Sequence, residues 1–175
     1  FMVTPIAGQP YDGGTGALLE SDKPIAVYVG APFEAIKVPY FEIIWEQLPP
    51  VSQWSDRHFV PPIHPNNQTR TILIGDNPIT NVTFRYFDDP NLVEYTIEVE
   101  AGQARYFDML GANEIVADGP VLIAQFETGH NPPPLLGDPY MMLVQPEARF
   151  KTSFIVRHPA LSSGFFESNT ITIVA

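Results

Sequence analysis

The feature that most constrains the fold of this chain is an internal repeat. The segment ESDKPIAVYVG at residues 20–30 has a close counterpart, VADGPVLIAQF, at residues 116–126. Each has an acidic turn followed by a proline and an apolar run, and Pro24 falls on Pro120 at an offset of 96 (120 − 24 = 96). The same offset relates six further pairs: Asp22 and Asp118, Ile25 and Val121, Val27 and Ile123, Pro50 and Pro146, Trp54 and Phe150, and Val60 and Val156. Chance does not hold one register over so many positions, so we interpret the chain as two copies of one unit.

Two shorter motifs extend the repeat in both directions. AGQ at residues 7–9 recurs at residues 101–103, and TILI at residues 71–74 recurs as TITI at residues 170–173. Two strands are expected before the second AGQ, whereas only FMVTPI precedes the first. We therefore expect either that an upstream portion is missing from this chain or that a strand from a neighbouring subunit completes the first copy.

Alternating polar and apolar residues predict antiparallel strands in the second copy. In NVTFRYF, Val82, Phe84 and Tyr86 alternate with polar residues, and LVEYTIEVE shows the same period beyond the turn DDPN. A period of two places one face of a strand in the core and the other in water. The runs PIAVYV and PVLIAQF do not alternate, so we expect them to be central strands covered on both faces.

One segment carries a helical pattern instead. The apolar residues of PYFEIIWEQLPP recur at i, i+3, i+4 and i+7 from Phe41 to Leu48, between flanking prolines. This spacing predicts a short amphipathic helix of about two turns, whereas the equivalent DPYMMLVQP reads as a turn or a strand. The predicted fold is all-β, with two tandem, internally repeated antiparallel β-sandwich-like units and short helical turns, over residues 1–75 and 76–175.

Composition excludes several classes of function. The formal net charge is −11 with only nine lysines and arginines, so the chain repels nucleic-acid backbones and anionic lipid. No apolar run approaches the roughly 18 residues of a membrane span. There is no cysteine, which removes disulfides, thiolate catalysis and cysteine zinc sites. Neither a G-x-S-x-G nor an HExxH motif occurs, so we expect a protein that is not an enzyme and that uses no cofactor.

Four motifs in order resemble those of the IgGFc-binding protein N-terminal domain family. They are the strand ESDKPIAVYVG, the segment WEQLPPVSQW, the strand VADGPVLIAQF and the segment GDPYMMLVQP. Members of that family carry similar strands and proline-rich segments in the same order, and the match covers roughly residues 17–146. The motif residues read as framework, and the family supplies no catalytic residues to carry over.

The resemblance implies a non-catalytic module, extracellular or on the cell surface, that binds or adheres to a macromolecular ligand, either a protein or a glycan. The alternative is a structural subunit of an extracellular filament or surface layer, self-assembling through its strand edges. In that second case, a strand from a neighbouring subunit completes the first copy.

The strongest candidate for a binding site is the proline-rich loop GHNPPPLLGDPY. It carries His130, Asn131, Asp138 and Tyr140 within a few residues of one another. Loops held on a rigid β scaffold are common binding sites, and a stiff loop loses little entropy when it docks. The alternative is a structural connection whose prolines stop strand pairing at an edge.

Weaker candidates lie in the turns. Asp76, Asp88 and Asp89 offer oxygen atoms that suit calcium, although Asp-Pro and Asp-Asn pairs are also ordinary turn residues. Asn67 and Asn81 begin N-x-[ST] glycosylation sequons.

The histidines and tryptophans are interpreted as structural. The four histidines are His58, His64, His130 and His158, and they show no short metal-binding spacing. Apart from His130, they are interpreted as scattered surface or turn residues. Trp45 and Trp54 occupy repeated framework positions, and we expect both side chains in the core.

Overall fold

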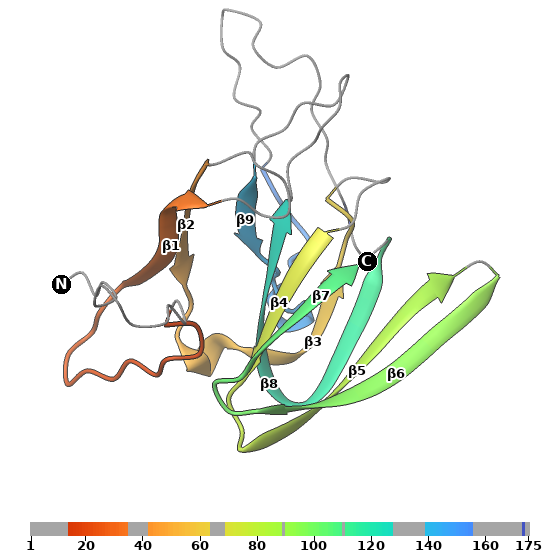
Figure 1. The fold of residues 1–175 in the computed structure, drawn as a ribbon, viewed down its shortest axis with the longest axis horizontal. Coiled ribbons are helices and arrows are strands. Elements are labelled where there is room, and N and C mark those ends of the chain that lie inside the picture. Colours follow the sequence, from red (N-terminus) through yellow and green to blue (C-terminus); the bar gives the residue numbers. More distant parts are fainter. Residues whose placement is uncertain are drawn as a thin grey trace, which may run out of the picture.

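The computed structural model describes residues 14–34, 42–63, 69–88, 90–109, 111–127, 139–155 and 173. Within these residues the chain forms nine β-strands and two single-turn 3₁₀ helices, so the predicted all-β class is confirmed (Figure 1). No helix in these ranges has the length and hydrophobicity needed to span a lipid bilayer.

The strands form two antiparallel sheets. A two-stranded sheet pairs β1 (Val27–Glu34) with β2 (Glu42–Leu48), and it is followed by the 3₁₀ helix η1 (Val51–Gln53). A seven-stranded sheet holds the other strands, and the 3₁₀ helix η2 (Glu147–Arg149) follows its last strand. Its members are β3 (Ser55–Val60), β4 (Thr69–Gly75), β5 (Ile79–Asp88), β6 (Asn91–Glu100), β7 (Ala104–Met109), β8 (Asn113–Glu127) and β9 (Tyr140–Leu143).

Strand β8 organises the large sheet, because β3, β4, β5 and β9 all pair with it. Val121 of β8 pairs with Ser55 of β3 and with Gly75 of β4, so these two strands lie on opposite edges of β8. One edge of β8 therefore carries β5 and then β4, and the other carries β3 and then β9. The partners change around residues 118–120, where Figure 1 shows β8 passing through a tight bend.

The bend in β8 is held by hydrogen bonds between Asp118 of β8 and Asn81 of β5. Asp118 accepts hydrogen bonds from the backbone nitrogen of Asn81 at 2.8 Å and from its side-chain Nδ2 at 2.6 Å. These bonds favour the carboxylate and lower the pKa of Asp118. At Gly119 a Cβ atom would overlap the side-chain amide of Asn77, so a larger residue there would require the Asn77 side chain to move. The DGP segment thus folds one sheet into two facing halves.

The core lies between these halves. Phe84 of β5 is fully buried, and its ring stacks on Tyr95 with 4.9 Å between centroids and packs against Phe107 at 4.6 Å. Aromatic pairs at such distances add to the hydrophobic stabilisation of a core. Residues from six strands and from the segment after β9 complete the cluster: Val60, Leu73, Val82, Val99, Met109, Ile115, Ala117, Val121, Ile123 and Val144.

Outside the core, a row of alternating charges crosses the sheet. Glu114 of β8 accepts a hydrogen bond from Arg57 at 2.6 Å and a longer one from Arg85 at 3.5 Å. Arg85 also pairs with Glu94, and Arg57 with Glu147. The hydrogen bonds from Arg57, followed by those from Arg85, lower the pKa of Glu114. Exposed pairs of this kind contribute little stability each.

The helix predicted between Phe41 and Leu48 is wrong, because this segment is strand β2. Its residues pair along β1 from Val27↔Leu48 to Glu34↔Glu42. The i, i+3, i+4 spacing is real, but the segment is short and rich in Ile and Trp, which suit strands. A backbone partner therefore outweighs the local pattern. The equivalent DPYMMLVQP contains strand β9, one of the two forms expected for it.

The expectation of two central strands holds for only one of the pair. PVLIAQF lies inside β8, between β4 and β9, so it is central in the sheet, but its residues alternate between buried and partly buried, so only one of its faces is fully covered. PIAVYV leads into β1, whose only partner among the described residues is β2. Tyr28 exposes 60% of its side chain. A proline-led apolar run thus predicts a strand but not the covering of its faces.

The tandem arrangement of two separate sandwiches is not confirmed. β3 and β4, which precede residue 76, lie in the same sheet as β5 to β9 and pair directly with β8. Two expected core positions also differ, since Trp45 is 52% exposed and Trp54 is only partly buried.

Candidate functional site

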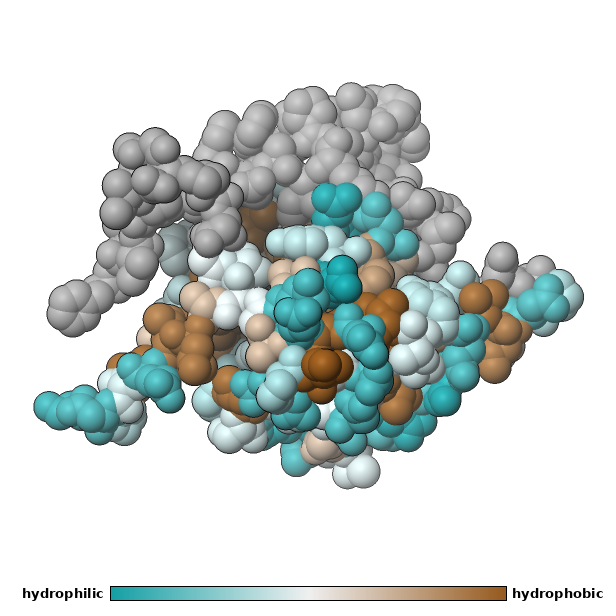
Figure 2. Space-filling view, turned by 60° about the horizontal axis from the view of Figure 1, so that its bottom comes forward, coloured by the Kyte–Doolittle hydropathy of each residue, from teal (hydrophilic) through white to brown (hydrophobic). Residues whose placement is uncertain are grey.

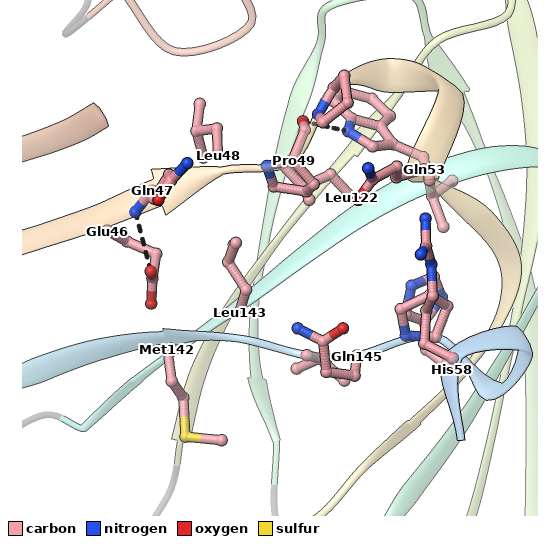
Figure 3. A pocket seen from close by; sticks show the side chains of 16 residues that line it. Glu46, Gln47, Leu48, Pro49, Gln53, His58, Leu122, Met142, Leu143 and Gln145 are labelled. Atoms are coloured by element: carbon pink, nitrogen blue, oxygen red, sulfur yellow. Dashed lines mark hydrogen bonds between the residues drawn. The ribbon is translucent and has the colours of Figure 1, made fainter. Parts of the chain in front are cut away.

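A pocket of about 500 Å³ lies between two similar segments of the described residues. One is the end of β2 with η1, and the other is the end of β9 with η2; β2 and β9 also contact each other. Figure 3 shows Leu143 pointing from β9 into the space below β2. The lining residues are Glu46, Gln47, Leu48, Pro49, Pro50, Gln53, Trp54, His58, Val121, Leu122, Met142, Leu143, Val144, Gln145, Pro146 and Arg149.

The two walls of this pocket share one strand-pairing register. In the first wall Tyr28 pairs with Gln47, and the pairing continues to Ala31 with Ile44. Adding 96 to each number gives Ala124 with Leu143 and Glu127 with Tyr140, which are the pairs at the two ends of β8–β9. All four pairs over this stretch coincide. The sequence offset is therefore also an offset in backbone pairing.

The turns that close the two strands are equally alike. Pro50 and Pro146 precede the 3₁₀ helices with extended backbones, at φ −62° and −70° and ψ 153° and 154°. Their carbonyl oxygens accept hydrogen bonds from Gln53 at 2.8 Å and from Arg149 at 2.9 Å. Proline fixes the φ that such an entry needs. The aromatic residues that follow the two turns differ. Trp54 donates its Nε1–H to the Pro49 carbonyl at 3.3 Å, a hydrogen bond that the Phe150 ring cannot make.

His58 closes the inner end of the pocket. Strand β3 places it opposite Ile115 and in a bridge with Pro146, where the residue is only 1% exposed. Its Nδ1 has no hydrogen-bond partner among the described residues. Burial lowers the pKa of His58 to about 4, and the attraction of Asp56 opposes this only partly. His58 is therefore neutral at pH 7, and its expected position on the surface or in a turn is wrong.

The chemistry of the lining suits binding. Leu48, Leu143 and Trp54 offer apolar surface, while exposed Gln53, Gln145 and Arg149 offer hydrogen-bond donors and acceptors at the rim. A pocket with apolar walls and a few polar groups orients a ligand. The lining residues include no serine, threonine, cysteine or lysine next to His58, so they contain no nucleophile for it to activate.

The structure tests little of the predicted binding loop. Tyr140 begins β9, pairs with Glu127 and exposes 44% of its side chain outside the pocket. Burial, aided by the charge of Glu127, raises the pKa of Tyr140. His130, Asn131 and Asp138 lie outside the described residues, so the binding role of this loop stays a prediction.

The calcium and glycosylation candidates also stay predictions. The described residues contain no group of three or more side chains arranged to hold a metal ion. Asp76 follows β4 and donates its backbone N–H to the Pro120 carbonyl. Asp88 ends β5, and Asp89 and Asn67 lie outside the described residues. The side-chain nitrogen of Asn81, the atom a glycan would modify, is hydrogen bonded to Asp118.

The motifs WEQLPPVSQW and GDPYMMLVQP, which contribute residues to the pocket lining, are interpreted from the sequence as framework. Their repeated prolines were visible at the offset of 96, but the offset alone does not show that two copies face each other. That juxtaposition comes from β9 pairing with β8 and lying against β2. No sequence signal separates His58 from the other histidines.

The sequence profile of a family described as IgGFc binding protein matches residues 8–175, nearly the whole chain. No curated protein and no solved structure matches the chain significantly.

Proposed function

Since the chain belongs to the IgGFc binding protein family, we propose that it is a non-catalytic extracellular or cell-surface module that binds a macromolecular ligand. A protein ligand is the first candidate because the family is one of protein-binding proteins, and a glycan is the second. The pocket between β2–η1 and β9–η2 is the proposed contact site.

The observation that carries this proposal is the pairing of the two pocket walls. Residues 46–53 and 142–149 correspond at the offset of 96 (46 + 96 = 142, 53 + 96 = 149) and face each other across about 500 Å³. Their rims present Gln53 and Arg149 at equivalent positions, both exposed. Proline-stiffened turns lose little entropy on binding, so such rims suit a ligand that spans both walls.

The test is binding of the purified chain to immobilised ligands, measured by surface plasmon resonance. The panel contains the Fc fragment of immunoglobulin G, other extracellular proteins and mucin glycans. We expect Gln53→Ala with Arg149→Ala to weaken binding to the recognised ligand at least about tenfold, as the loss of central contacts does in other interfaces.

The matched control is Lys151→Ala, which removes an exposed positive charge two residues from Arg149 and outside the pocket lining. It should leave the dissociation constant unchanged. Retention of no extracellular ligand by the unmodified chain would refute the function. Binding that survives the pocket variant undiminished would refute the site while keeping the function.

A further inference from the structure

Among the described residues, the outer edge of β1 has no partner strand and lies beside exposed apolar side chains. Among the described residues β1 hydrogen-bonds only to β2. Ile25, Tyr28 and Val29 are 57%, 60% and 38% exposed. Figure 2 shows hydrophobic surface on the side of the molecule where Figure 1 places β1 and β2. A two-stranded sheet is marginal alone, and an open edge of this kind readily accepts another strand.

The rest of the fold shows which strand fits such an edge. β8 occupies the position equivalent to β1, and β9 the position equivalent to β2, in the same register. The edge of β8 that faces away from β9 is filled by β4, with Ile72 opposite Ala124 and Leu73 opposite Ile123. The equivalent edge of β1 is the one that has no partner strand in the part of the chain that the structure describes.

The sequence contains a second copy of the strand that fills this edge in the large sheet. TILI of β4, at residues 71–74, recurs as TITI at residues 170–173, an offset of 99 (170 − 71 = 99). Moving the β4–β8 pairs by these offsets places Ile171 opposite Tyr28 (72 + 99 = 171, 124 − 96 = 28) and Thr172 opposite Val27. The alternation of Thr and Ile matches a strand with two distinct faces.

We propose that residues 169–174 of a second copy of this chain add to the open edge of β1, antiparallel, with Ile171 opposite Tyr28. Ile173 lies in no strand and exposes 84% of its side chain, so it does not occupy this edge within its own chain. The added strand would satisfy the edge N–H and C=O groups and cover Tyr28 and Val29. Reciprocal exchange closes a dimer, and one-way donation extends a filament. This interaction is independent of ligand binding at the pocket.

Because the chain has no cysteine, any disulfide in a cross-linking test must join the introduced residues. Directly opposed residues in a sheet bring their Cβ atoms to roughly 4.5–5.5 Å, close enough for a disulfide after small adjustment. One preparation carries Tyr28→Cys and the other carries Ile171→Cys, and the two are mixed and mildly oxidised. We expect a disulfide-linked heterodimer on a non-reducing gel. Dithiothreitol should convert it back to monomers.

Two controls address register and face. Thr172→Cys mixed with Tyr28→Cys should cross-link far less, because residue 172 points to the opposite face of the strand. Tyr106→Cys, another exposed tyrosine (56% exposed) but on β7, should not cross-link to Ile171→Cys. Circular dichroism verifies that every variant keeps its β-sheet content.

Independent support should come from light scattering of the cysteine-free protein. The unmodified chain should form dimers or larger assemblies, and Ile171→Lys with Ile173→Lys should shift it to monomer. A monomeric unmodified chain overturns the proposal. So does an intramolecular disulfide in a Tyr28→Cys/Ile171→Cys double variant that remains monomeric, because the segment would then pair within its own chain.

Discussion

Acidification from pH 7 to pH 4.5 should destabilise this protein through His58. The side chain is buried, and its pKa is lowered to about 4 by desolvation. In the unfolded chain histidine titrates near its ordinary pKa of about 6.5. Between these values the unfolded state binds a proton that the folded state does not, so the free energy of unfolding falls as the pH falls.

The size of the effect follows from the two pKa values. A difference of about 2.5 corresponds to about 3 kcal/mol of stability, present above pH 6.5 and lost below pH 4. About 2 kcal/mol of this should disappear between pH 7 and pH 4.5. Carboxylates such as Glu114, whose pKa is lowered by Arg57, also make the stability sensitive to acid. The contribution of His58 must therefore be separated by comparison with a variant.

His58→Phe provides that comparison, because phenylalanine fills a similar buried space and does not titrate. Urea unfolding followed by tryptophan fluorescence at pH 7, 5.5 and 4.5 gives the free energy of unfolding of both proteins. Any fixed packing cost of the substitution cancels when each protein is compared with itself across pH. The variant should lose about 2 kcal/mol less than the unmodified protein.

Equal losses of stability in the two proteins over this pH range would contradict the predicted role of His58. So would an NMR titration that shows the imidazole of His58 taking up its proton near pH 6.5, since burial would then not disfavour the charged form. The remaining histidines are common to both proteins, so they do not affect the difference.

Two further perturbations test the β1–β2 ribbon and the bend of β8. In Gly30→Ala the new Cβ would overlap the carbonyl oxygen of Ile44, so β1 should separate from β2. Hydrogen exchange of the β1 amides should accelerate while β8 stays protected, and unchanged protection of β1 would contradict this. Asn81→Ala removes the side-chain hydrogen bond to Asp118 and should lower the midpoint of thermal or urea unfolding slightly, because this bond lies at the exposed surface. The pKa of Asp118 should move back toward its ordinary value, and an unchanged pKa would show that Asn81 does not hold it down.

The sequence by itself determined the all-β class of this protein and several of its landmarks. Strict alternation in NVTFRYF predicted β5, because a side-chain period of two arises only in an extended backbone with one buried face. The offset of 96 likewise placed Pro50 and Pro146 at equivalent positions, and each precedes a 3₁₀ helix with a similar backbone conformation, since proline restricts its own φ wherever it stands. Local covalent geometry and periodicity act within a few residues, so they can be read along the chain.

The tertiary structure alone decided how the strands are partnered. Residues Glu42–Leu48 carry a helical spacing and yet form β2, because pairing with β1 satisfies their backbone hydrogen bonds. The burial of His58 and the exposure of Tyr28 depend on which segments pack against them, β8 and Pro146 in one case and β2 alone in the other. Burial and pairing are set by residues distant in sequence, and the free energies of those contacts exceed the local preferences that a sequence pattern records.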